Sequence, residues 1–487
     1  MTMLPDGEAP SRSPVGLSAV VERAAGGAVA ILRINGRPLA GGVAQRSALM
    51  KLIGRLGRSR DVRAIVLTGA GLFDHDGFAA HEDLDALLGL VASSPAPIVA
   101  AIAGDATGAG LELALACAGR VCAPTSTFAW RGVAAARLPR AATLVHLARR
   151  AGMEAAADLV AFGRPLSAAG AAGVGLIDRV CCGDLAEAAG PWALTEGTAR
   201  GLAPLALNVE AEVFGLRLKL RRHAPGQVAP LAAVRALEAA AALPERRLVA
   251  EIDRISSELA RSEQGIALHY AAAGEAALEA LGEDAPALAT RLNWSLAREA
   301  IHLIDAGATP AQVDRRLEAY GFAEGPFARS DRLGMARVFA VTEGAPPGDD
   351  AWISYSPTID LMADAQRPGG PGAAGWYRRA GDGSQVRFDP EVDELVRASA
   401  LGQRLNRTPI ADEVVVERCL RAAIEATAGH ETADLCAAVL DAVWVRHLGF
   451  PRWRGGPLWQ AQQMGLRTRA APSRGRGLRP AATTSTA

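Results

Sequence analysis

Glu112 is the residue whose type and setting point most directly to chemistry. It follows the small-residue stretch 104–110 and opens the Leu- and Ala-rich segment 111–118, which has the composition of a buried helix. Backbone N–H groups at the start of such a helix can bind an anion or a polarised oxygen. A carboxylate in the first turn of an apolar helix must be paired, hydrated or raised in pKa, so Glu112 is a candidate acid or base. The alternative is an acidic residue that only complements the helix dipole.

The segments around Glu112 predict an α/β core. The apolar run 98–103 follows two prolines and is typical of a buried strand, and 28–34 and 64–67 are further strand candidates. Leu49, Leu52, Ile53 and Leu56 recur between them at helical spacing. Strands that alternate with helices indicate a layered α/β fold.

Composition excludes several classes of protein. The 487 residues are 50% hydrophobic and carry no net charge, so nothing global attracts nucleic acid. No two of the six cysteines are spaced as Cys-x-x-Cys in the sequence, so we expect reduced thiols and no zinc site. The uncharged run 86–104 contains two serines and two prolines, which favours a helix end, turn and strand over a membrane span. No signal peptide is visible, and we expect a cytoplasmic protein.

The segment 108–112 resembles the motif of the enoyl-CoA hydratase/isomerase (crotonase) family, in which a glycine-rich turn opens a helix with a catalytic glutamate. It reads Gly108-Ala109-Gly110-Leu111-Glu112, with alanine in place of the middle glycine. The resemblance implies a ββα spiral fold and an acyl-CoA thioester ligand. Two backbone N–H groups would hold the thioester carbonyl, and Ala109 would supply one of them.

The family's other N–H donor comes from a loop that is altered in this chain. Gly77 could still donate, but the family's Phe-Ser-Ala-Gly-Ala-Asp is replaced by Phe73-Asp74-His75-Asp76-Gly77-Phe78. The three polar residues in this loop could form a new site or a solvated cluster. Losing one such donor costs ~10²–10³ in rate.

The family's second catalytic stretch aligns without gaps to residues 127–152. It normally reads Pro-Glu where this chain has Arg131-Gly132. In the hydratases the two glutamates hold and deprotonate the water and protonate the α-carbon. A general acid or base contributes roughly 10²–10⁴ in rate, so the glycine implies severely reduced hydration. His146 could act as a substitute base or could be a core or surface histidine.

The rest of the chain resembles multifunctional fatty-acid β-oxidation proteins. Residues 251–274 resemble the linker helix of those proteins, and residues 290–466 resemble the duplicated C-terminal domain of 3-hydroxyacyl-CoA dehydrogenases. Asp314 and Asp441 stand at similar places in the two copies, each followed by a Gly-Pro turn. The NAD-binding domain, ~100–200 residues by ordinary domain size, has no counterpart in the short interval 275–289.

A dinucleotide-type pattern does occur at Gly370-Pro-Gly372-Ala-Ala-Gly375, but no apolar strand precedes it. It resembles instead a linker between the dehydrogenase modules. We therefore expect neither NAD nor any other cofactor or metal, and acyl-CoA as a ligand.

The sequence thus predicts an α/β crotonase (ββα spiral) domain followed by an all-α duplicated dehydrogenase C-terminal domain. The expected segments are a disordered N-terminus at 1–15, a core at 16–206, a helical extension and linker at 207–288, helical modules at 289–380 and 381–466, and a disordered tail at 467–487. The favoured function is an acyl-CoA-binding protein of β-oxidation with impaired hydratase and no dehydrogenase activity. An active hydratase/isomerase using Glu112, or a docking subunit for a thiolase or dehydrogenase, are the alternatives. A homo-oligomer also stays open.

Overall fold

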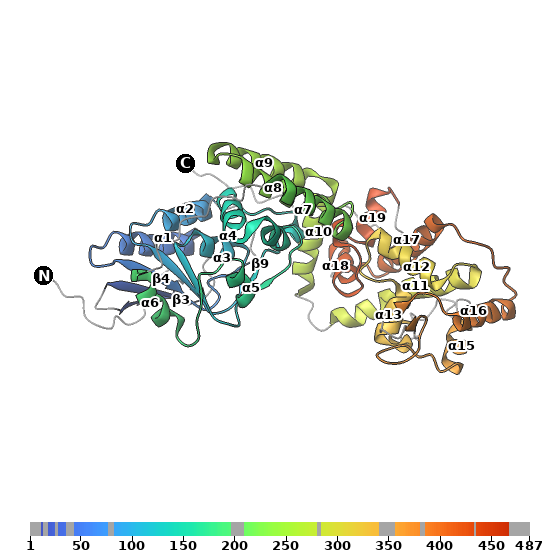
Figure 1. The fold of residues 1–487 in the computed structure, drawn as a ribbon. Coiled ribbons are helices and arrows are strands. Elements are labelled where there is room, and N and C mark those ends of the chain that lie inside the picture. Colours follow the sequence, from blue (N-terminus) through green and yellow to red (C-terminus); the bar gives the residue numbers. More distant parts are fainter. Residues whose placement is uncertain are drawn as a thin grey trace. The chain divides into compact units, whose positions relative to one another are not determined.

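The computed structural model describes residues 11–12, 18–24, 28–35, 43–75, 82–195, 209–279, 284–339, 356–379, 385–432 and 435–466. The expected N–H donor Gly77, Asp76 beside it, most of the N-terminal segment 1–15 and the tail 467–487 lie outside these residues. The chain divides into two compact units, residues 1–266 and 267–487 (Figure 1).

A mixed sheet forms the centre of the first unit, in the order β1-β2-β3-β4-β6-β8-β11. β1, β2 and β3 pair antiparallel, and the pairs from β3 to β11 are parallel. Every residue of β4 and β6 is buried, which explains why both strands are continuous apolar runs. The strands are β1 (Ser11–Arg12), β2 (Ser18–Ala24), β3 (Val29–Asn35), β4 (Ala64–Thr68), β6 (Ile98–Ile102), β8 (Gly119–Cys122) and β11 (Arg179–Val180).

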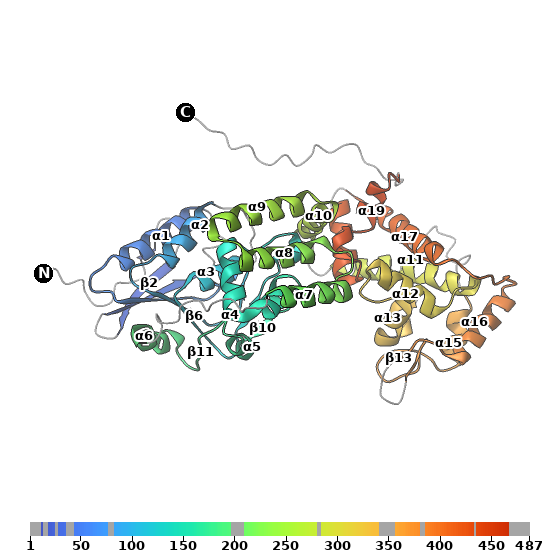
Figure 2. The same ribbon diagram turned by 45° about the horizontal axis from the view of Figure 1, so that its top comes forward.

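Helices cover both faces of this sheet (Figures 1 and 2). α6 (Leu185–Thr195) packs on one face, where Leu185 and Ala189 meet valines of the parallel strands. The other face carries α1 (Val43–Gly57), α2 (Glu82–Ala92) and α3 (Gly108–Ala116). The run 86–104 is therefore the end of α2, a turn and β6, as predicted. None of the helices in the described ranges combines the length and the apolar character that a membrane span needs.

A second, smaller sheet positions the start of α3. Its order is β10-β9-β7-β5, with β5 (Asp74–His75), β7 (Ala106–Thr107), β9 (Thr127–Ala129) and β10 (Leu166–Ser167). β7 leads directly into α3 and pairs with β5 on one side and β9 on the other. The first unit also contains α4 (Ala141–Val160), α5 (Ala168–Gly173), and, packed on α4, α7 (Val209–His223), α8 (Val228–Ala242) and α9 (Glu245–Arg261).

The second unit is helical in its described part, apart from the ribbon β12 (Arg378–Arg379) and β13 (Gln385–Val386). α10 (Glu263–Leu278) leads into it. The remaining helices are α11 (Asp284–Ala306), α12 (Pro310–Tyr320), α13 (Pro326–Leu333), α14 (Met335–Phe339), α15 (Thr358–Asp364), α16 (Pro390–Gly402), α17 (Asp412–Ala428), α18 (Ala437–His447) and α19 (Pro457–Gln463).

The predicted duplication is visible as one arrangement used twice. In the first copy, buried Asp314 on α12 accepts the N–H groups of Phe327 at 3.1 Å and Ala328 at 2.7 Å, at the start of α13. In the second, Asp441 on α18 accepts the first N–H groups of α19, each at 2.8 Å. A tyrosine hydroxyl donates to each carboxylate, from Tyr377 at 2.8 Å and from Tyr270 at 3.0 Å. The fold class predicted from the sequence is confirmed in both units.

Candidate functional site

α3 begins at Gly108, three residues earlier than predicted. Two glycines of the motif explain this. Gly108 has φ +47°, a left-handed conformation that favours glycine. Gly110 has no room for a side chain, because a Cβ there would lie 1.7 Å from the carbonyl oxygen of Phe73. Glu112 is therefore in the second turn and not in the first, which argues against a role limited to the helix dipole.

Glu112 is buried, with 1% of its surface exposed, and its carboxylate accepts hydrogen bonds from Arg140 and Thr143. Oε1 accepts the backbone N–H of Arg140 at 2.8 Å and the hydroxyl of Thr143 at 3.3 Å. Oε2 forms an ion pair with the Arg140 guanidinium. Arg140 is the N-cap of α4, so these contacts join the middle of α3 to the start of α4.

Arg140 also bridges Glu112 to a second carboxylate. Its Nε atom pairs with Asp85 on α2, whose side chain is mostly exposed. Burial acts to lower the pKa of Arg140, but the charges of Glu112 and Asp85 outweigh it and leave the pKa raised. The guanidinium therefore lies between two carboxylates.

Burial raises the pKa of Glu112, while the charge and N–H groups of Arg140 and the Thr143 hydroxyl act in the opposite direction. Both oxygens accept donors, which is the arrangement that an ionised carboxylate makes. The contacts with Arg140 favour the ionised form and oppose the effect of burial on the pKa of Glu112.

Gly132, where the family's second glutamate would stand, is the first residue of the short 3-10 helix η2 (Gly132–Ala135). The space beside it is filled, because a Cβ on Gly132 would lie 2.6–2.9 Å from atoms of the Trp130 indole. That ring is 2% exposed, and its Nε1 donates to the carbonyl oxygen of Arg137 at 3.3 Å. Position 132 thus has neither a carboxylate nor room for one.

Other predicted site residues lie elsewhere or are described only in part. Ala109 is buried between the two motif glycines. Its role as an N–H donor stays a prediction, as does that of Gly77. Asp74 accepts a hydrogen bond from the Thr107 hydroxyl at 3.2 Å, which ties the altered loop to the start of α3. His146 lines a cavity beside Cys117, past the end of α3.

The glycine-rich stretch 370–375 is a structural turn. It follows α15 and leads into β12, so no strand precedes it and no helix follows. Asp331 accepts the next two N–H groups, of Trp376 at 2.7 Å and of Tyr377 at 3.0 Å. Within the described residues, no group of three or more His, Cys, Asp and Glu side chains is placed to hold a metal ion.

Arg140 and Asp85 were not among the predicted site residues. A signal for Arg140 existed, because the glycine-rich segment that normally follows the family's second glutamate is replaced here by residues 140–146. No comparable signal exists for Asp85, whose role depends on where α2 packs.

Two family models match the chain. Residues 47–189 match enoyl-CoA hydratase/isomerase, and residues 288–379 match the C-terminal domain of 3-hydroxyacyl-CoA dehydrogenase. A probable enoyl-CoA hydratase of Mycobacterium avium is 36% identical over 193 residues, which cover 35% of this chain and 73% of that protein.

The peroxisomal bifunctional enzyme of Danio rerio is 31% identical over 185 residues, 34% of this chain and 25% of that enzyme. The chain thus spans about a quarter of the length of the bifunctional relatives it matches. Among solved structures, a monofunctional enoyl-CoA isomerase from M. smegmatis is 27% identical, with a TM-score of 0.32, and the match covers 44% of this chain and 97% of that one.

Proposed function

Because the chain belongs to the enoyl-CoA hydratase/isomerase family, we propose that it is an acyl-CoA-binding protein of fatty-acid β-oxidation in which hydration is strongly impaired. It would derive from a bifunctional hydratase/dehydrogenase, and its C-terminal unit would act without NAD or dehydrogenase activity of its own. The observation that carries the proposal is the binding of the Glu112 carboxylate by Arg140.

Two separate defects reduce hydration in this proposal. Gly132 offers no second carboxylate, and the Trp130 indole fills the space beside it. Glu112 remains, but an ion pair with Arg140 stabilises its ionised form and opposes the rise in pKa that burial causes. Since one general acid or base contributes roughly 10²–10⁴ in rate, losing one and restraining the other leaves little hydration.

Acyl-CoA binding does not need the two catalytic glutamates. The turn that opens α3 keeps its geometry through Gly108 and Gly110. Ala109 is not a proline, so its backbone N–H could donate to the thioester carbonyl. Backbone donors do not depend on side-chain identity, so a carbonyl-binding turn can outlast the loss of a catalytic glutamate.

The test combines binding and turnover. Binding of crotonyl-CoA is measured by calorimetry, and its hydration is assayed with the wild type, Glu112→Gln and Glu154→Gln, an exposed glutamate on α4 that serves as the matched control. Binding with hydration at the background rate for all three proteins supports the proposal. A substantial wild-type rate that Glu112→Gln abolishes and Glu154→Gln preserves overturns it.

That second outcome would support the enzymatic alternative, a one-glutamate hydratase or isomerase. The burial that raises the pKa of Glu112 favours this alternative, because a carboxylate with a raised pKa is a stronger proton acceptor. Failure to bind acyl-CoA, together with co-purification of a thiolase, would support a docking subunit instead.

A further inference from the structure

The cavity that His146 lines lies at the edge of the sheet where β4, β6 and β8 begin. Its volume is about 630 Å³, and Arg63, Ile98 and Ala118 mark the starts of the three strands in its lining. The turn that opens α3 follows β6 and β7, at the opposite edge, and α3 runs back from it to Ala116, which lines the cavity. Glu112 and Arg140 are not part of the lining.

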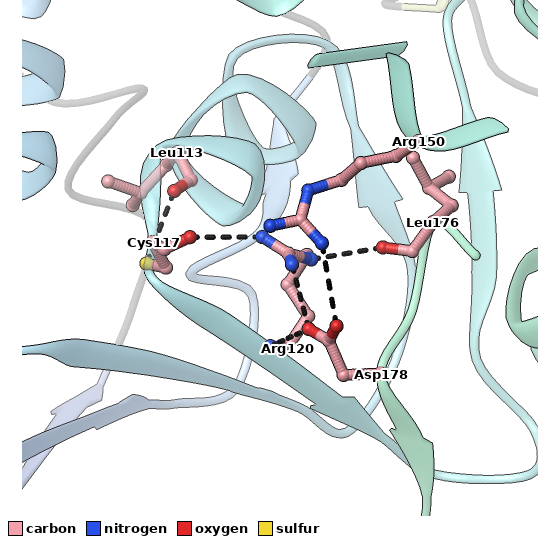
Figure 3. A network of polar contacts seen from close by, with 6 residues as sticks. All are labelled: Leu113, Cys117, Arg120, Arg150, Leu176 and Asp178. Carbon is pink, nitrogen blue, oxygen red and sulfur yellow. Dashed lines mark hydrogen bonds and ion pairs between the residues drawn. The ribbon is translucent and has the colours of Figure 1, made fainter. Parts of the chain in front are cut away.

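Two residues of the lining, Cys117 and Arg150, belong to a buried network of polar contacts (Figure 3). Arg120 donates to Asp178 at 2.7 Å and to the carbonyl oxygens of Leu176 at 3.0 Å and Cys117 at 2.9 Å. Arg150, which lines the cavity, pairs with the other oxygen of Asp178 at 3.5 Å. The three charged side chains are 1%, 4% and 10% exposed for Arg120, Asp178 and Arg150. Among the described residues of this network, two buried arginines share one buried carboxylate.

His146 adds an unused polar atom to this wall. It lines the cavity one turn before Arg150 on α4, and its Nδ1 atom is buried with no hydrogen-bond partner among the described residues. Such atoms are rare in folded proteins and often mark the place of a ligand or water. Burial and the charges of Arg120, Arg150 and Arg149 lower the pKa of His146 to about 4, so the ring is neutral and one tautomer presents an N–H at Nδ1.

We propose that this cavity binds a small anion with a phosphate or carboxylate group, held by Arg150, Arg63 and His146. The anion would pair with Arg150 and supply the acceptor that His146 Nδ1 lacks. Arg63 is exposed at the mouth, where it can meet an entering anion. The volume falls within the roughly 300–1,000 Å³ of small-molecule sites.

The ring of His146 provides a direct readout. The full-length protein, labelled at its eight histidines, is titrated with inorganic phosphate at constant ionic strength, with chloride as the reference salt and malonate as a dicarboxylate probe. His146→Gln identifies the His146 resonance. We expect this resonance to shift saturably with phosphate or malonate and not with chloride. The stronger of the two anions then distinguishes a phosphate ligand from a carboxylate ligand.

Two neighbouring arginines provide a matched pair of variants. Arg150→Gln should weaken the anion response at least tenfold, whereas Arg149→Gln, an exposed residue outside the cavity lining, should weaken it less than twofold. If Arg150→Gln does not fold, His146→Gln takes its place, with anion-dependent thermal stabilisation as the readout. Equal weakening by Arg149→Gln, or the same response to all three anions, would refute a built site. No response at all would mean that the carboxyl ends of α2 and α3 balance the arginines, and the proposal would fall.

Discussion

Replacing Arg140 by glutamine tests whether the ion pair with Glu112 stabilises the first unit. The change removes the charged partner of a carboxylate that is 1% exposed, while the backbone N–H of residue 140 and the Thr143 hydroxyl remain. Breaking a fully buried pair costs ~3–5 kcal/mol. The Arg140 side chain is 28% exposed and two donors persist, so we expect a loss of about 2–3 kcal/mol near pH 8.

The loss should depend on pH with a definite sign. Without Arg140, burial raises the folded-state pKa of Glu112 further above its unfolded value of about 4.3. A raised folded pKa means that the variant keeps its stability below the unfolded pKa and loses it as the pH rises through the folded pKa. The difference between wild type and Arg140→Gln should therefore be small at pH 4.5 and largest at pH 8.

This difference is measured by urea unfolding, with hydrogen exchange of peptides from α3 and α4 as the readout for the first unit. Arg149→Gln, exposed on the same helix, is the matched control and should change stability by less than ~0.5 kcal/mol. If Arg140→Gln and Arg149→Gln have the same free energy of unfolding at both pH values, Glu112 does not depend on Arg140. The proposed effect of Arg140 on the chemistry of Glu112 would then have no basis.

Restoring the missing carboxylate by Gly132→Glu should not restore hydration. It should also destabilise the protein by ~1–3 kcal/mol, because the new Cβ meets the Trp130 indole. A hydratase assay measures the first effect and urea unfolding measures the second. A fully stable single variant would contradict this. Burial raises the pKa of Asp314 and Asp441 to about 7, above their unfolded values near 3.9, so the second unit should lose stability as the pH rises from about 4 through 7. Asp314→Asn should flatten this dependence by about half, and an unchanged pH profile in urea unfolding would show that Asp314 does not titrate in this range.

The sequence was informative where short patterns determine structure. The run 98–103 became β6, the glycines at 108 and 110 marked the start of α3, and the paired Asp and Gly-Pro signals at Asp314 and Asp441 predicted a duplicated arrangement. Each of these depends on residues close in the chain, where spacing and backbone preference carry the information. The start of α3 was wrong by three residues, because tertiary packing of Gly110 on the backbone of Phe73 extends the helix.

The contacts that decide the chemistry depend on packing between distant segments. Trp130 and Gly132 are neighbours in sequence, yet only the fold shows that the indole fills the space beside the glycine. The tyrosines on Asp314 and Asp441 come from separate segments, 63 and 171 residues away, so no local pattern relates them. A motif therefore located Glu112, but not what holds it.

The ion pair between Glu112 and Arg140 changes how relatives of this chain should be sorted. A survey that scores a glutamate after a glycine turn would count this protein among the competent enzymes. Under the proposed function, the residue that distinguishes this chain from those enzymes is Arg140, 28 positions after Glu112. Its ion pair would make Glu112 a structural contact between two helices, so the motif would predict the fold and not the reaction.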